Sequence, residues 1–163
     1  MTRMLESGED PLYVARRIVR FASEDIGLAE PQAMSVAVSC FQAAHYIGLP
    51  ECTTSLAQAA VYMAIAPKSN RIYVAYESAK KEVARNPDLP VPFRLRNPVT
   101  PFMKESGYGK DYLYPHDSDT GFIREPYLPE SLQEQRFYVP SFIGKEKKIR
   151  EYLESIWKRT YPK

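Results

Sequence analysis

Few side chains in this sequence have the types and spacing that chemistry requires. The most suggestive group is a glycine-rich turn that ends in a lysine, Gly107-Tyr-Gly-Lys110. A nucleotide-binding phosphate loop needs a glycine five positions before its Gly-Lys pair and a serine or threonine after it. Those two positions hold Lys104 and Asp111 here. The segment is therefore predicted to be a helix stop followed by a tight aromatic turn.

Neither a metal site nor a nucleophilic site is predicted. His116, Asp117 and Asp119 are close together, but no further ligands stand at the spacings that zinc or calcium sites use. The two cysteines, Cys40 and Cys52, and the two histidines are too scattered to indicate a Cys/His pair. We therefore expect no catalytic residue and no metal ligand in this chain, and predict that the chain is not an enzyme.

A charged row near the start of the chain could make contacts instead. Arg16, Arg17 and Arg20 precede the adjacent carboxylates Glu24 and Asp25. Neighbouring helix positions point about 100° apart, so the two carboxylates are not predicted to share one site. We expect them to pair with the arginines or with another subunit. For the arginines, a solvated helix face remains as plausible as a contact with another subunit or with nucleic acid.

A second basic group lies near the end of the chain. Its basic residues alternate with glutamates that can form ion pairs one helical turn away. The basic residues are Lys145, Lys147, Lys148 and Arg150, and the glutamates are Glu146, Glu151 and Glu154. We expect this group to be a solvated helix face rather than a binding site.

The elements that carry these residues are predicted to be helices, and the fold class to be all-α. Asp10 and Pro11 are typical of a helix start, and apolar residues then recur at helical spacing up to Gly27. Similar patterns predict helices over residues 31–48, 51–66 and 69–85. The connections are short, so neighbouring helices are expected to pack as a bundle. We assign residues 1–86 to this helical core.

The second half of the chain has a different composition. Most of the 14 prolines lie after residue 86, and proline interrupts helices because it lacks the amide hydrogen. Residues 87–140 are therefore predicted to be an irregular Pro-rich and aromatic segment, packed on the helical core, with one short helix over residues 99–106. Residues 141–163 are predicted to form a C-terminal amphipathic helix over residues 144–160.

Composition and charge narrow the functional classes. The formal net charge is +2, which is too balanced to indicate nucleic-acid or membrane binding from bulk electrostatics. Two cysteines do not make a disulfide framework and favour a reducing compartment. The sequence shows no signal peptide and no apolar run near the roughly 20 residues that span a bilayer. We expect a cytoplasmic protein without a membrane contact.

Several segments, taken together and in order, carry a family resemblance. The segment SGEDPLYVARRIVRFASEDIGL, residues 7–28, resembles the C-terminal region of the replication-associated recombination protein A family. That family is also called maintenance of genome stability protein A, and its eukaryotic relative is the Werner helicase-interacting protein. The similarity continues, as far as Tyr138, in AQAAVY (57–62), APKS (66–69), VPFRLRN (91–97), MKESGYGK (103–110) and YLPE (127–130).

The resemblance also implies a function and partners, which the residues alone do not indicate. Members are AAA+ ATPases related to clamp loaders, so this chain would be the portion after the nucleotide-binding module. That module would bind ATP and magnesium, and this chain no cofactor. The expected role is a non-catalytic oligomerisation domain that holds a homotetramer, in a protein that acts at stalled replication forks and in recombination and repair. Expected partners are DNA and single-stranded-DNA-binding protein, with association to the nucleoid if the source is bacterial.

Two residue sets are predicted as contact sites. For oligomer or interdomain contacts we select the polar side of the first long helix, namely Tyr13, Arg16, Arg17, Arg20, Glu24 and Asp25. The alternative function is a stand-alone module that binds single-stranded nucleic acid, because basic residues beside aromatic ones can contact phosphates and stack on bases. Its contacts would be Arg94, Arg96, Lys104, Tyr108, Lys110 and Tyr112. Loop aromatics packed on the bundle are the competing interpretation.

Overall fold

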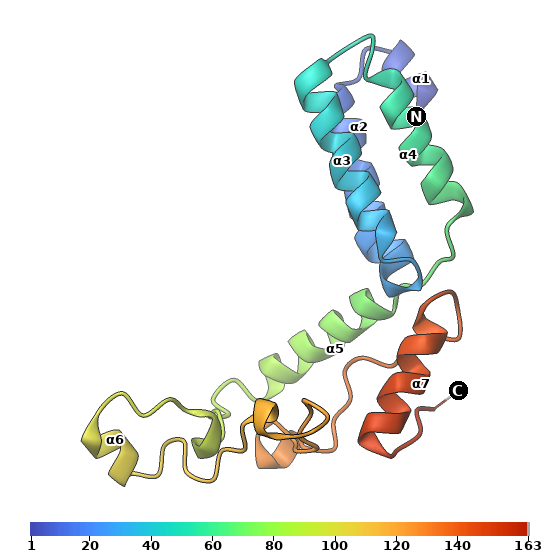
Figure 1. Cartoon of the computed structure of the whole chain (residues 1–163). Coiled ribbons are helices and arrows are strands. Elements are labelled where there is room, and N and C mark those ends of the chain that lie inside the picture. Colours follow the sequence, from blue (N-terminus) through green and yellow to red (C-terminus); the bar gives the residue numbers. More distant parts are fainter. Residues whose placement is uncertain (163) are drawn as a thin grey trace.

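The computed structural model describes residues 1–162 and confirms an all-helical fold, with seven α-helices over that range. The chain has two arms (Figure 1). One arm is a bundle of α1–α4, and the other contains α5, the Pro-rich segment with α6, and α7. The arms meet at the connection between α4 and α5. The boundary between the arms therefore lies before α5, whereas the change in composition lies after residue 86.

The first arm begins with the short helix α1, Thr2–Glu6, and the long helix α2, Pro11–Phe21. Asp10 caps α2, because its Oδ1 accepts a hydrogen bond of 2.9 Å from the amide of Leu12. The helix then widens into a π-helical turn, Ala22–Ile26, and ends in a 3-10 turn, Gly27–Ala29. The predicted stop at Gly27 is confirmed, with φ at 53°.

Two further helices complete the bundle. Helix α3, Gln32–Ile47, packs against both α2 and α4, Thr53–Ile65. The core is rich in alanine, which lets the helix axes approach closely. Its buried residues are Val14, Ala15, Ala22, Ile26, Ala33, Ala37, Cys40, Ala44, Cys52, Leu56, Ala59, Met63 and Ala66. Both cysteines are buried and free.

Helix α5, Arg71–Arg85, departs from the expected bundle. It contacts the base of the first arm at the turns after α2 and then points away from α2–α4 (Figure 1). None of its residues is buried. The expected side-by-side packing therefore holds for three of the four predicted helices. Because α5 has no helix beside it, its apolar side chains face solvent.

The Pro-rich segment also lies elsewhere than expected. It contains α6, Pro101–Glu105, and 3-10 turns at Phe93–Leu95, Pro115–Asp117 and Glu130–Leu132. In Figure 1 it continues from the far end of α5 and returns to α7, away from α1–α4. Two hydrogen bonds attach it to the C-terminal part, from Arg124 Nε to the Ile156 carbonyl at 2.8 Å and from Arg136 Nη1 to the Thr160 carbonyl at 3.2 Å.

The last helix, α7, Glu146–Trp157, starts beside the base of the bundle. The amide of Lys145 donates to the carbonyl of Ala29 at 2.8 Å, and Lys145 Nζ pairs with Glu30 at 2.7 Å. Gly144 has φ 54°, and a Cβ there would lie only 2.2 Å from the Ala29 carbonyl oxygen. Only glycine therefore permits this approach. Within residues 1–162, no helix is long and apolar enough to cross a membrane.

Truncation of the bundle core should destabilise the chain. Leu56 is 0% exposed and lies in the cluster shared by α2, α3 and α4. We expect Leu56→Ala to lower the free energy of unfolding by about 2–5 kcal/mol, because it removes buried apolar surface and leaves a cavity. Val83→Ala on exposed α5 should change it by less than about 0.5 kcal/mol. Urea denaturation compares the two, and equal losses would contradict the described core.

Candidate functional site

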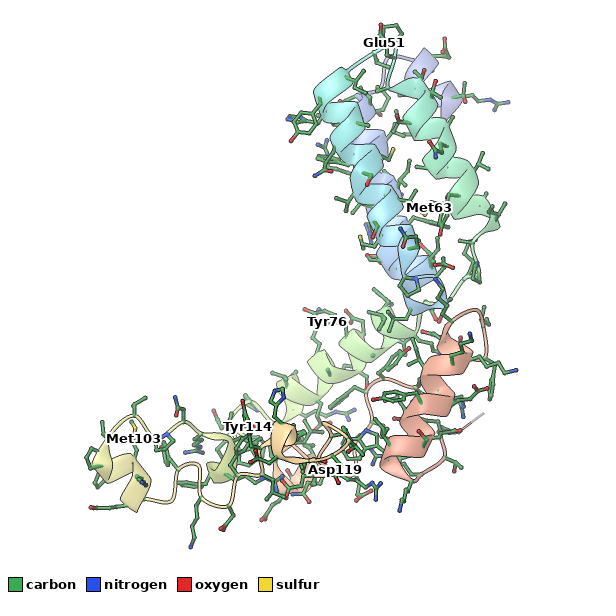
Figure 2. All side chains as sticks on the ribbon, in the orientation of Figure 1. Glu51, Met63, Tyr76, Met103, Tyr114 and Asp119 are labelled. Carbon is green, nitrogen blue, oxygen red and sulfur yellow. The ribbon has the colours of Figure 1, made fainter. Side chains whose placement is uncertain are left out.

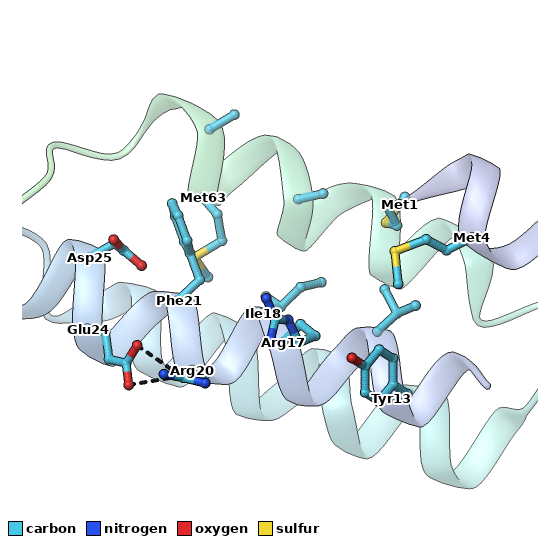
Figure 3. Close-up of a pocket in the computed structure, with 13 residues that line it drawn as sticks. Met1, Met4, Tyr13, Arg17, Ile18, Arg20, Phe21, Glu24, Asp25 and Met63 are labelled. Carbon is cyan, nitrogen blue, oxygen red and sulfur yellow. Dashed lines mark hydrogen bonds and ion pairs between the residues drawn. The ribbon is translucent and has the colours of Figure 1, made fainter. Parts of the chain in front are cut away.

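An open groove between α2 and α4, closed at one end by α1, is the main concave surface of the bundle (Figure 3). Its apolar lining comes from three helices and includes several flexible methionine side chains. The apolar lining residues are Met1, Met4, Val14, Ile18, Phe21, Ala60, Met63 and Ala64. Met, aromatic and Arg residues are enriched at protein interfaces. This composition is typical of a docking surface.

Five of the six predicted contact residues line this groove: Tyr13, Arg17, Arg20, Glu24 and Asp25. Tyr13, Arg17, Arg20 and Glu24 are spaced by three or four positions, which places them on one side of α2 and its π-helical extension, and Asp25 follows Glu24 directly. Figure 3 shows Tyr13 near the α1 end and Glu24 and Asp25 near the other end. The sixth, Arg16, does not line the groove and lies 3.5 Å from Asp10 instead.

The charges on the α2 side are partly neutralised within the chain. Arg20 Nε lies 2.9 Å from both carboxylate oxygens of Glu24. This hydrogen bond, together with the charge of Glu24, raises the pKa of Arg20. The opposite side, formed by α4, has no charged residue. The groove therefore has one charged rim and one uncharged rim.

The groove offers no reaction chemistry. Its carboxylates either pair with Arg20 or lie at its exposed edge, and no histidine or cysteine lines it. Across the residues that the structure describes, no group of His, Cys, Asp and Glu could hold a metal ion. Gly107 and Gly109 have φ values of 89° and 69° directly after α6, as expected for a helix stop and a tight turn.

The predicted nucleic-acid contacts divide into two groups. Arg96 packs against two aromatic rings that contact each other, with its Cζ 4.3 Å from the centroid of Phe93 and 5.1 Å from that of Tyr108. Arg94 pairs with Glu125 at 3.2 Å and donates to the Pro126 carbonyl. These side chains already bind the irregular segment together.

The second group of predicted nucleic-acid contacts is more accessible. Lys104, Lys110 and Tyr112 are exposed. A second hollow includes Arg94, Arg96 and Lys110, but Glu125 and Glu130 also line it. Its mixed charge gives no continuous basic surface for a phosphate backbone.

The solvated face predicted near the end of the chain is wrong for two residues. Glu146 is 0% exposed and Arg150 is 5% exposed. Glu146 accepts hydrogen bonds from Ser69 Oγ at 2.8 Å, from the Ser141 amide at 2.8 Å and from Tyr138 Oη at 3.0 Å. Ser69 lies in the connection between the two arms and the other two donors precede α7, so this carboxylate ties α7 to the junction of the arms.

Arg150 lies one turn further along α7, and its hydrogen bonds hold the residues that follow this helix. It donates to the carbonyls of Pro140 at 2.9 Å and Pro162 at 2.8 Å, and also to that of Tyr161. Its Nε lies 3.3 Å from Glu154. The local sequence does not distinguish Glu146 and Arg150 from their exposed neighbours, because most of their hydrogen-bond partners lie outside α7.

Burial of Glu146 raises the pKa of its carboxyl, but the hydrogen bonds from Ser141, Ser69 and Tyr138 lower it more, so that the net pKa lies below the ordinary value. Burial and the nearby Glu146 carboxylate raise the pKa of Tyr138. Both shifts keep Glu146 charged and Tyr138 protonated at neutral pH, which is the state in which the phenol donates to the carboxylate.

Loss of the Glu146 charge should weaken the junction. A carboxyl whose pKa is lower in the folded chain stabilises it above the unfolded pKa, near 4.5, and this contribution disappears as the pH falls through the folded pKa. We expect Glu146→Gln to lower the free energy of unfolding by about 1–3 kcal/mol at pH 7. Its loss of stability below pH 4.5 should be less steep than in the wild type.

Urea denaturation between pH 7 and pH 3 measures this effect. Glu151→Gln is the matched control, because Glu151 is an exposed glutamate of the same helix. Identical pH profiles for the two variants would contradict the role of Glu146 at the junction.

Comparison with known proteins identifies the family. Residues 1–157 match the family described as MgsA AAA+ ATPase C terminal. Replication-associated recombination protein A of Coxiella burnetii is 48% identical over 155 residues, which cover 94% of this chain and 35% of that protein. Its Escherichia coli K12 counterpart is 44% identical over 152 residues, covering 93% and 34%. ATPase WRNIP1 of Dictyostelium discoideum is 46% identical over 137 residues, covering 83% and 16%.

These matches refine the resemblance seen in the sequence. The family match continues past Tyr138 and includes α7, whereas the recognisable segments end at Tyr138. The chain spans between 16% and 35% of the length of the three relatives described. The matched part is the C-terminal region and not the ATPase module. The chain thus belongs to the MgsA AAA+ ATPase C-terminal family, whose relatives include replication-associated recombination proteins.

Proposed function

We propose that this chain is the assembly domain of its AAA+ ATPase and holds the subunits together as a homotetramer. The domain has no catalysis of its own, and its role is to set the number and geometry of the ATPase modules that address one DNA substrate. The number four comes from the family resemblance. The physical support comes from the surface of the chain.

The observation that carries the proposal is the amount of exposed surface. The chain exposes 11,340 Å². A compact monomer of this mass is expected to expose about 8,300 Å², so the excess is about 3,000 Å². Stable interfaces bury about 800 Å² on each partner, and permanent assemblies bury more. The excess is large enough for more than one contact per subunit.

The groove between α2 and α4 supplies one suitable surface for such a contact. Its apolar floor is flanked by Tyr13, Arg17 and Arg20, which are residue types that dominate binding energy when an interface covers them. The Arg20–Glu24 pair is already formed in the single chain, so a partner would meet a prearranged rim. We assign Tyr13, Arg16, Arg17, Arg20, Glu24 and Asp25 to intersubunit or interdomain contacts.

The wider setting of the proposal follows the relatives. The nucleotide-binding module of the whole protein would bind ATP and magnesium. That protein would act in the cytoplasm, at the nucleoid if bacterial, on DNA at stalled replication forks, and single-stranded-DNA-binding protein is a further partner. The names of the relatives refer to replication and recombination, which supports this setting.

Binding of single-stranded nucleic acid by this chain itself is the second candidate function. The favourable observation is that Lys110 and Tyr112 are exposed in one turn and Lys104 lies exposed on nearby α6. The opposing observation is that the ring of Tyr108 and the guanidinium groups of Arg94 and Arg96 already have partners in the chain. The assembly proposal is therefore favoured.

Self-association is the direct prediction of the assembly proposal. Sedimentation velocity from low to high micromolar concentration should show a concentration-dependent shift from monomer toward tetramer, because an excess of about 3,000 Å² per chain can be buried. Addition of 1 M salt should weaken the contacts of the charged rim but leave those of the apolar groove floor intact. A strict monomer at every concentration would refute the proposal.

The nucleic-acid alternative has its own test. Fluorescence anisotropy with a labelled single-stranded oligonucleotide should show weak binding at low salt that disappears as salt rises, since phosphate contacts release counterions. Replacing Lys104 and Lys110 with alanine should weaken any binding, whereas replacing exposed Lys80 and Lys81 of α5 should not. Absence of binding at low salt would exclude this function for the isolated chain.

A further inference from the structure

Helices α3 and α4 lie in a part of the sequence that is nearly free of charge. Between residues 32 and 65 the only Asp, Glu, Lys or Arg is Glu51, although 26% of the whole chain is charged. Glu51 lies in the connection between α3 and α4 at the far end of the bundle (Figure 2). The solvent-facing sides of both helices therefore have no Asp, Glu, Lys or Arg, which is unusual for surface helices.

The outer face of α4 is the clearest case. Thr54, Gln58, Val61 and Ile65 are spaced by four, three and four positions, so they form one stripe along the helix. Val61 is 61% exposed and Ile65 is 77% exposed. Ala57 and Ala64 beside them are also exposed and small, which allows another helix to approach closely. Ala64 also lines the groove, so the stripe and the groove form one continuous surface.

The two helices with exposed apolar residues, α4 and α5, differ in their charge. Helix α5 also presents apolar residues, and its Val83 is 65% exposed. However, α5 carries four basic residues, Arg71, Lys80, Lys81 and Arg85, against two glutamates, Glu77 and Glu82. Two copies of α5 placed face to face would bring like charges together. Two copies of α4 would not.

We propose that the outer face of α4 packs against the same face of a second copy of this chain, around a two-fold axis. This inference rests on the proposed assembly function and names the surface that performs it. A symmetric contact places residues near the axis beside their own counterparts. Like charges there would cost several kcal/mol, and interface cores in general are depleted of charged residues. The stripe on α4 has no charged residue, so it can face its own copy near the axis and form an interface core.

The contact leaves the charged rim of α2 for a different interface. A tetramer built as a dimer of dimers needs two different self-complementary surfaces. The stripe on α4 makes the first contact, and Arg17, Arg20, Glu24 and Asp25 remain available for the second. The excess exposed surface of about 3,000 Å² accommodates both.

Charge substitution on α4 tests the proposal with the full chain. We expect Val61→Lys to raise the dissociation constant for self-association roughly 100-fold, because two ammonium groups would face each other near the axis. Val83→Lys is the matched control, since it adds the same charge at a valine of similar exposure on α5. It should change the constant by less than about threefold. Sedimentation velocity gives the constants, and circular dichroism melts verify folding.

A mixing experiment tests the symmetry itself. Val61→Glu alone should be as weak as Val61→Lys, whereas an equimolar mixture of the two should associate at least as well as the wild type, because opposite charges then face each other. A mixture as weak as either variant alone would overturn the two-fold arrangement.

The failure of this inference can be distinguished from failure of the assembly function. If Val61→Lys does not fold, Ile65→Lys at the more exposed end of the stripe takes its place, with the same expected result. If the wild type associates and the α4 variants associate equally well, the α4 surface is wrong and the assembly proposal stands. A monomeric wild type overturns both.

Discussion

The buried carboxylate of Glu146 ties the last helix to the point where the two arms meet, and the packing of α7 depends on it. An ionised carboxylate is costly to bury unless hydrogen bonds replace the lost water. Its three donors belong to Ser69, Tyr138 and Ser141. Ser69 precedes α5, whereas Tyr138 and Ser141 precede α7. All three segments must therefore be in place together, and the last helix becomes part of the base of the bundle despite its distance in sequence.

The bundle itself combines a small core with a large accessible surface. Alanine contributes many of the buried positions, so the helices lie close together but each buries little apolar area. The larger apolar side chains, such as Val61 and Ile65, often remain on the outside. Apolar surface that would stabilise a monomer if it were buried in the core is thus available for contacts with other molecules. The charges of the first long helix and the absence of charge on α4 make the two sides of the groove chemically different.

Local signals predicted the helices well, because helix ends depend on a few neighbouring residues. Asp10, Gly27, Gly48 and Pro67 mark the ends that the structure shows. The spacing along α2 also located one rim of the groove. The direction of α5 and the position of residues 87–140 were not predictable in this way, since both depend on contacts between distant segments. The burial of Glu146 has the same cause, and the uncharged side of α4 resembled an ordinary helix core in sequence.

The 15-residue helix α5 contacts the turns after α2 at the base of the bundle and has no buried residue. Such a helix is about 22 Å long, and a 10° tilt at its base would displace its far end by about 4 Å. α6 lies beyond that end (Figure 1). A small change in the direction of α5 at its base would therefore be magnified at its far end.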